Sequence, residues 1–362
     1  MLGRKCISPY YSERANFARM KRCTMNLAIN VLCALILFLL WGCKTDHAGI
    51  PGRSYSGTLL GMKYEIDTPG DTIDRSDIID SVFRSFELIF NSSSAHSLIN
   101  EINNFKRTDT VFVVTDSTRL FGIVYDMASD LSRNTQRGWD PALAPLRRNL
   151  LMNGSSAHVT DTLLEACAFN DFNIRMQEHF DERGSYLKTS LLKRNLLIEL
   201  DFTDIASALA VDYLAEAFVI HGVKSFRITH ADDMLCQGLS GNELATVQLG
   251  IGTGGENPKV DVGNIAFARR DIEHKKSLID PSTGYYSEGP VIYTAVVSPK
   301  LTEARIFCQA FIIQDLSSIA DYYNQNPETN VHSFIFFQQG DTIQNASTSG
   351  FDQRIVLNKP TE

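Results

Sequence analysis

The sequence lacks the cysteine and histidine patterns of the common metal centres. Its 7 cysteines and 8 histidines form no Cys-x-x-Cys pair, no zinc-type spacing and no His-x-His or His-x-x-x-His element. Those sites hold their ion through nitrogen and sulfur ligands at short, regular spacings. The pattern therefore argues against a metal cluster built from Cys and His.

A basic run of the kind that binds nucleic acid is also missing. The formal net charge is −8, and residues 1–42 contain six basic side chains against one acidic one, so residues 43–362 carry −13. A surface with that charge repels a phosphate backbone. We therefore expect no nucleic-acid partner.

The glycine-rich stretch at residues 250–258, "GIGTGGENP", lacks the features of a phosphate-binding loop. It has no Lys-Ser/Thr ending, and no helical pattern follows it, although both are needed to hold a nucleotide phosphate. We interpret it as a surface loop.

The one long hydrophobic run is short for a membrane span. Residues 27–41 read "LAINVLCALILFLLW", after Lys21 and Arg22 and before Cys43. A run of 15 residues with basic residues before it is typical of a secretory signal. Because the run ends in Leu-Trp-Gly-Cys, it resembles a bacterial lipobox, in which the cysteine is diacylated through its sulfur and becomes the new N-terminus after cleavage.

We therefore expect a signal peptide at residues 1–42, with Met20 as a second candidate start, then lipidated Cys43 and a linker to residue 54, and a folded domain at 55–362. The protein would sit on the outer side of the cytoplasmic membrane or in the outer membrane, anchored to lipid. An uncleaved N-terminal anchor is the alternative, and it leaves the same domain outside the cytoplasm.

Three cysteines remain in the folded domain, and their spacing is wide. Cys167 and Cys308 lie in apolar runs, so we expect both to be small buried hydrophobic residues.

Helical and strand patterns alternate along the domain. Strands are expected at 56–67, 110–115, 196–202, 225–229, 291–298 and 333–338, and helices at 76–90, 116–132, 204–222 and 302–314. The helix at 76–90 is the clearest, because its apolar residues recur on one face and Asp77 lies in its first turn. Asp116 or Ser117 is expected to cap the helix at 116–132. This mixture, with strand pairs joined as hairpins, favours an α+β fold of mainly antiparallel sheets with packed helices.

Five short stretches in a fixed order resemble the ApbE-type FAD:protein FMN transferases. They are "GTLLGMKY" at 57–64, Ser97 with Asn103, "WDPALAPL" at 139–146, "LDFTDIASALAVD" at 200–212 and "LIDPSTGY" at 278–285. The resemblance spans about Gly57 to Phe351. It implies an ApbE-like layered fold and a reaction in which FMN passes from FAD to a Thr or Ser of an exported flavoprotein.

The family's chemistry implies a magnesium ion on the FAD pyrophosphate, since phosphoryl transfer depends on charge neutralisation and positioning. The resemblance also implies cofactor-binding positions at Gly61, Tyr64, Ser97 and Asp232, and a catalytic role for Asp280.

The positions that hold metal in the family carry unsuitable side chains here. They fall on Ser207, Arg305 and Gln309, and an arginine, which has only hydrogen-bond donors and a positive charge, cannot supply the hard oxygen ligand that magnesium prefers. Fold-building residues such as Asp280 are retained. We therefore expect impaired catalysis by the family mechanism.

Two interpretations of Arg305 stay open. Its guanidinium could replace the cation and bind a pyrophosphate, with Gln309 donating beside it, so that FAD binds without metal. Alternatively, it fills an inert pocket. Two functions follow: an FMN transferase of the family's kind, or a non-catalytic, membrane-anchored binding or assembly module on the same fold.

Overall fold

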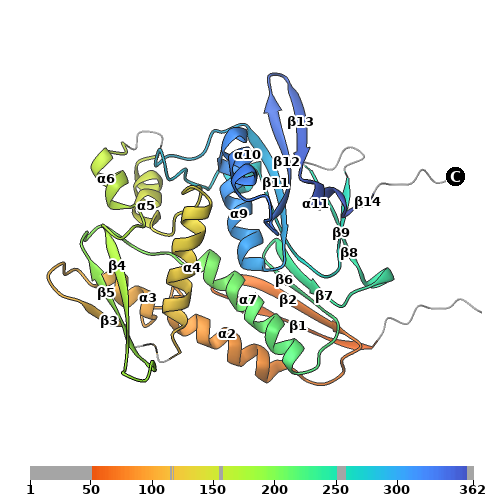
Figure 1. Cartoon of the computed structure of the whole chain (residues 1–362), viewed down its shortest axis with the longest axis horizontal. Helices are drawn as coiled ribbons and strands as arrows, with labels where there is room; N and C mark the ends of the chain where they lie inside the picture. The colour runs from red at the N-terminus through yellow and green to blue at the C-terminus, as the bar shows by residue number, and fades with distance from the viewer. Residues whose placement is uncertain (1–50, 115, 117, 155–157, 251–257, 357–362) are drawn as a thin grey trace, which may run out of the picture. The chain divides into compact units, whose positions relative to one another are not determined.

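The computed structural model describes residues 51–356 except 115, 117, 155–157 and 251–257. Its main feature is an eight-stranded, wholly antiparallel sheet in the order β1-β2-β6-β7-β10-β11-β12-β13 (Figure 1). The strands are β1 (Gly52–Leu59), β2 (Met62–Pro69), β6 (Phe226–His230), β7 (Asp233–Gln237), β10 (Ala266–Asp271), β11 (Val291–Ser298), β12 (His332–Gln339) and β13 (Thr342–Ser347).

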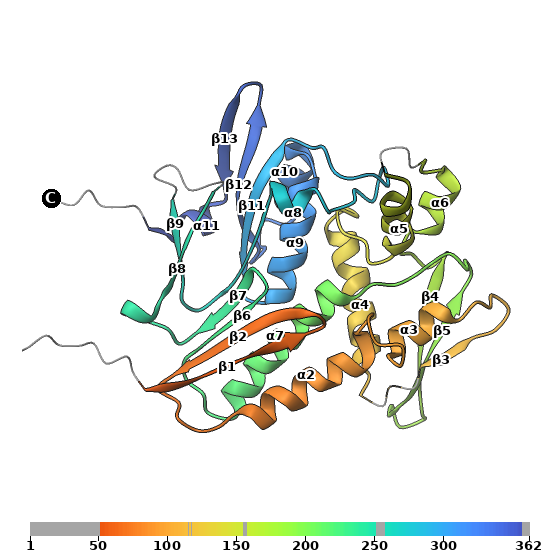
Figure 2. The same ribbon diagram turned by 180° about the vertical axis from the view of Figure 1, so that it is seen from behind.

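Helices cover one face of this sheet. The two central ones are α7 (Thr203–Ile220) and α9 (Leu301–Ile313), with α2 (Ser76–Phe90) against α7 and α9 against β10 and β11 (Figures 1 and 2). The helix α10 (Leu316–Gln325) follows α9, and α4 (Leu120–Asn134) contacts α7. All residues of α9 except Glu303 are buried, so any polar side chain on it must find partners inside the protein.

The opposite face of the sheet carries a second, smaller core. Side chains alternate along β10, so that Ala266 and Ala268 face the helices while Phe267 faces this core. It is closed by the sheet β14-β9-β8 and by Phe351 of the short helix α11 (Ser349–Asp352). Those strands are β8 (Ala245–Gln248), β9 (Lys259–Val262) and β14 (Ile355–Val356).

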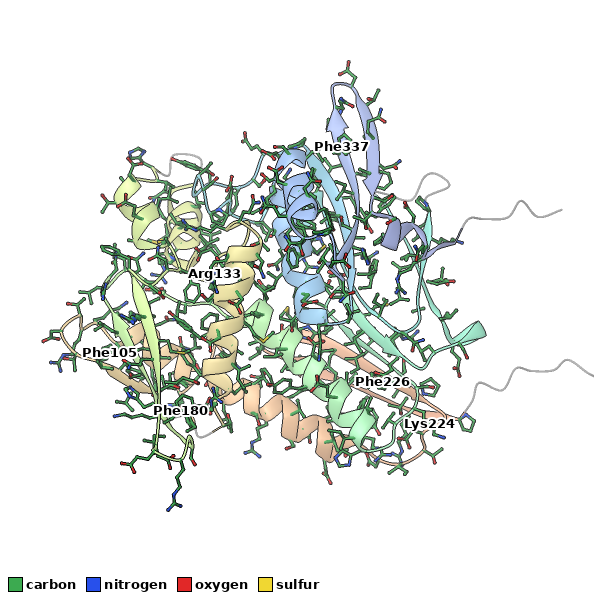
Figure 3. All side chains as sticks on the ribbon, in the orientation of Figure 1. Phe105, Arg133, Phe180, Lys224, Phe226 and Phe337 are labelled. Atoms are coloured by element: carbon green, nitrogen blue, oxygen red, sulfur yellow. The ribbon has the colours of Figure 1, made fainter. Side chains whose placement is uncertain are left out.

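A third sheet, in the order β3-β5-β4, lies beside α3 and α4 (Figure 1). The remaining elements are β3 (Phe112–Val114), β4 (Ile174–Phe180), β5 (Tyr186–Lys193), α3 (Leu98–Asn104), α5 (Ala144–Asn153), α6 (Asp161–Ala166) and α8 (Ile272–Lys275). Figure 3 shows Phe105 and Phe180 at this sheet, whereas Phe226 lies at α7, where it packs against Phe218 with ring centroids 5.4 Å apart.

The expected α+β class with mainly antiparallel sheets is confirmed, and α2 has the predicted bounds. The segment 56–67 is not one strand: Leu60 and Gly61, with φ of 49° and 82°, form the two-residue turn between β1 and β2. The helix α4 begins at Leu120, later than predicted. Asp116 nevertheless accepts a hydrogen bond from the Phe121 amide at 2.7 Å.

The strand predicted at residues 196–202 is wrong. These residues lie outside the strands, and the Leu200 backbone pairs with the side-chain amide of Asn103, which donates to its carbonyl at 2.9 Å and accepts from its N–H at 2.8 Å. A side chain therefore satisfies the backbone groups that a neighbouring strand would have bonded.

Candidate functional site

Two helices bring Ser207, Arg305 and Gln309 into one place. Ser207 lies on α7, and the other two lie one turn apart on α9, which contacts α7 directly. Ser207 Oγ accepts a hydrogen bond from Arg305 Nη1 at 2.7 Å. The family resemblance predicted one site for these residues, and the structure brings Ser207 and Arg305 into contact although they are 98 positions apart in the chain.

The guanidinium of Arg305 is fully engaged by protein atoms. It is 1% exposed, and its five N–H groups match five acceptor contacts. Nε donates to Asp233 Oδ2 at 2.5 Å, Nη1 donates to Ser207 Oγ and to the Asp204 carbonyl at 3.5 Å, and Nη2 donates to Nδ1 and the carbonyl of His230 at 2.9 and 3.1 Å. A pyrophosphate would have to displace these acceptors to bind Arg305.

Asp233 forms ion pairs with two arginines. Besides Arg305, it accepts hydrogen bonds from both terminal nitrogens of Arg270, Nη1 to Oδ1 at 2.7 Å and Nη2 to Oδ2 at 3.1 Å. Burial alone would raise the pKa of Asp233, but the two guanidinium charges outweigh it and hold that pKa far below its usual range. The carboxylate is therefore ionised and bridges the strand β10 to the helix α9.

His230 completes this buried cluster as a neutral ring. Burial, followed by the charge of Arg305, lowers the pKa of His230 to about 3. Nδ1 accepts from Arg305, so the proton lies on Nε2, which faces the Leu59 carbonyl at 3.4 Å. We call Ser207, His230, Asp233, Arg270 and Arg305 the arginine cluster.

Gln309 is 6% exposed, and within the described residues its amide has no hydrogen-bond partner. It lines a small inner chamber of about 40 Å³, together with Trp139, Asp140, Arg147, Asp201 and Asp204. A pocket for a cofactor-sized ligand measures roughly 300 to 1,000 Å³. The chamber is therefore far too small for a flavin in this conformation.

The first two predicted cofactor positions lie on the hairpin β1–β2. Gly61 forms the turn, with open space beside it, and Tyr64 pairs across the strands with Gly57. The Tyr64 ring packs edge-on against Phe83 with centroids 4.9 Å apart. Tyr64 is also the register partner of His230, so the hairpin borders the arginine cluster.

Ser97 and Asp232 have local partners. Ser97 is buried and caps α3, where its hydroxyl accepts from the Asn100 amide. Asp232 lies in the exposed turn between β6 and β7, and its Oδ2 is 3.1 Å from Nε2 of His274. Among the described residues, neither the Ser97 hydroxyl nor the Asp232 carboxylate forms a hydrogen bond with the arginine cluster. Asp233, the residue after Asp232, belongs to the cluster.

Asp280 stands in a tight turn that borders a larger pocket. Its Oδ1 accepts from the amide and the hydroxyl of Ser282, and its own amide donates to the Tyr285 carbonyl. Gly284, with φ of 75°, closes the turn. Asp280, Tyr285 and Tyr286 line a pocket of about 670 Å³.

A profile of the ApbE family matches residues 57–333 of this chain. The chain belongs to the ApbE family. A search of curated proteins finds no match.

Solved structures of ApbE proteins share the fold at low sequence identity. The flavin transferase ApbE from Vibrio cholerae is 16% identical, with a TM-score of 0.67 over 84% of this chain and 100% of its own. The apo form of the Pseudomonas stutzeri flavinyl transferase ApbE is 15% identical, with a TM-score of 0.66 over 86% and 98%. The ApbE protein from Thermotoga maritima is 14% identical, with a TM-score of 0.63 over 84% and 99%.

The residues at the ApbE metal positions do not fit magnesium. That ion takes oxygen ligands in near-octahedral geometry, whereas a guanidinium supplies only donors. Arg305 also donates hydrogen bonds to the Asp204 carbonyl and the Ser207 hydroxyl, so both of these oxygen atoms already have a partner. In the described part of the chain, no group of three or more His, Cys, Asp or Glu residues is arranged to hold a metal ion.

Three members of the arginine cluster, His230, Asp233 and Arg270, were missed from the sequence. Asp233 was overlooked beside the predicted Asp232. The signal was strand alternation: Arg270 follows Ala266 and Ala268 on the helix-facing side of β10, where an isolated charge needs a buried partner. Asp233, opposite His230 in the hairpin β6–β7, is that partner.

Cys43 and the predicted signal peptide lie outside the described residues, as does most of the glycine-rich loop. Among the described helices, none has the length and apolar character needed to cross a bilayer. Cys167 and Cys308 are free and buried, as predicted.

Proposed function

We propose that this protein is a membrane-anchored, extracytoplasmic binding member of the ApbE family that does not transfer FMN by a magnesium-dependent mechanism. The observation that carries the proposal is the arginine cluster. Arg305 stands at a position where the family has a ligand to magnesium. Its N–H groups already donate hydrogen bonds to protein acceptors. Without a cation, nothing in that position neutralises a pyrophosphate during phosphoryl transfer.

The size of the inner chamber supports the same proposal. Its volume of about 40 Å³ beside Gln309 leaves no room for a flavin unless the surrounding helices move. Bound magnesium would neutralise the charge of the pyrophosphate. In this chain Arg305 and Arg270 instead form ion pairs with Asp233, and these ion pairs stabilise the packing of α9 on the sheet.

The competing function is transfer of FMN from FAD to a Thr or Ser of an exported flavoprotein. Family membership over residues 57–333 favours it. In that case FAD would be the substrate, and other side chains would have to hold magnesium.

One assay separates the two functions. The full-length protein in detergent is incubated with FAD and a flavoprotein acceptor, with and without magnesium, and AMP release and acceptor-bound flavin fluorescence are measured. The Vibrio cholerae flavin transferase is the positive control. We expect neither product from this protein under either condition.

Magnesium-dependent AMP release with flavin on the acceptor would overturn the proposal. A double variant, Arg305→Asp with Gln309→Thr, places a carboxylate and a hydroxyl, both oxygen ligands that suit magnesium, at these two positions and serves as a second measurement. We expect magnesium to raise its melting temperature but not that of the wild type.

A further inference from the structure

A polar pocket lies at the C-terminal end of α9, beyond the inner chamber. Its volume is about 670 Å³, and its wall includes Arg137, Asp280, Tyr285, Tyr286, Glu288 and Asp315. We call it the tyrosine pocket. It adjoins the inner chamber, since Gly138 and Ile313 line both. A volume of this size is typical of small-molecule sites.

The carboxylates of the tyrosine pocket have unused oxygen atoms. Asp280 and Asp315 each use Oδ1 for two local hydrogen bonds, Asp280 with Ser282 and Asp315 with Ser317 and Ser318, while Oδ2 has no partner within the described residues. The side chain of Glu288 has no hydrogen-bond partner there either, and it is exposed. Three carboxylates can therefore accept hydrogen bonds from a ligand.

Arg137, which brings positive charge to the pocket wall, already forms an ion pair. Arg137 Nη2 lies 3.3 Å from Oδ2 of the buried Asp140. The pocket potential is therefore negative, which attracts cations and repels phosphates. Tyr285 and Tyr286 add aromatic faces, and such faces bind ammonium groups through their negative quadrupole.

The inner chamber supplies an independent indication of a ligand. Gln309 is more than nine-tenths buried as a residue, and within the described chain no group hydrogen-bonds to its amide, which remains accessible to a ligand in the chamber. The carboxylate of Asp204 lines the same chamber and likewise has no hydrogen-bond partner among the described residues. One ammonium group could donate to the Gln309 carbonyl and to Asp204 together.

We propose that the tyrosine pocket and the inner chamber bind an extended aliphatic diamine or polyamine. One ammonium group contacts Gln309 and Asp204 in the chamber, and another contacts the carboxylates of Glu288 and Asp315 in the pocket. The inference deepens the proposed binding function and rests on it, by naming a ligand class.

The test is isothermal titration of the full-length protein in detergent with spermidine and putrescine. Glucose and AMP are the neutral and anionic control ligands. We expect saturable 1:1 binding of a diamine or polyamine, which weakens as salt is added, and no saturation with either control.

Substitutions test which residues form the binding site. Gln309→Leu and the pair Glu288→Gln with Asp315→Asn should each weaken binding by roughly tenfold or more, because each removes hydrogen bonds to a charged group. Asn at 315 keeps an acceptor for the helix cap. Glu328→Gln is the matched control, since Glu328 is exposed and does not line the pocket or the chamber; it should leave binding unchanged.

No saturation with either amine would overturn the inference, as would tighter binding of glucose or AMP, or equal weakening by Glu328→Gln. These outcomes leave the proposed absence of magnesium-dependent FMN transfer standing, because that part of the proposed function is overturned only by turnover in the FMN-transfer assay with magnesium.

Discussion

At the scale of single residues, Asp233 connects the two arginines of the arginine cluster. Among the described residues it is the carboxylate that pairs with both Arg270 and Arg305, and all three side chains are buried. Desolvating two guanidinium groups is expensive unless a counter-charge and full hydrogen bonding compensate.

Asp233→Asn should destabilise the protein by about 3 to 5 kcal/mol, because it leaves two buried positive charges without a counter-charge. Chemical denaturation followed by circular dichroism measures the change. The control is Asp67→Asn, which removes the half-exposed pair with Arg227 and should cost about 0 to 1 kcal/mol. Equal effects of the two substitutions would mean that the cluster adds little to stability.

At the scale of elements, the hairpin β1–β2 depends on a close approach between its strands. Gly57 pairs with Tyr64, and a Cβ atom at residue 57 would lie 2.6 Å from the Tyr64 hydroxyl oxygen and 2.8 Å from the ring carbon that bears it. The glycine therefore allows the Tyr64 ring to lie across β1 while it packs against Phe83.

Gly57→Ala should cost about 1 to 3 kcal/mol through overpacking. Thermal unfolding of Gly57→Ala, Tyr64→Ala and the double variant measures it. The double variant should lose less stability than the sum of the two single losses, because a Cβ atom at residue 57 then no longer meets the Tyr64 ring. Ser56→Ala, exposed on the same strand, is the control, and additive losses would contradict the proposed collision.

At the scale of the whole molecule, the proposed location depends on the N-terminal segment and on Cys43. The segment 27–41 has the length of a signal and ends at a lipobox-like sequence. A lipid on Cys43 would hold the domain at a membrane surface, where two acyl chains give stable anchoring.

Cys43→Ser should move the protein from the membrane fraction to the soluble fraction and abolish labelling by a radioactive fatty acid. Cys23→Ser, in the segment that would be removed, is the matched control and should change neither readout. Unchanged fractionation of Cys43→Ser, without labelling of the wild type, would favour the uncleaved anchor.

The sequence by itself determined the fold class, the family resemblance and most of the elements. Periodicity was sufficient for α2, whose apolar face is continuous, and for β11, which is buried along its length. It failed at residues 196–202, because the Asn103 side chain satisfies the Leu200 backbone from almost 100 positions away. Local sequence patterns cannot reveal a hydrogen-bond partner so far away in the chain.

The sequence also placed Ser207, Arg305 and Gln309 at one site and indicated that magnesium would not fit them. Only the tertiary structure decided what Arg305 does there. Its partners come from α7, β6 and β7, and the second arginine on Asp233 comes from β10. The charge state of such a cluster depends on burial and on distances across five elements, and these quantities exist only once the chain is folded.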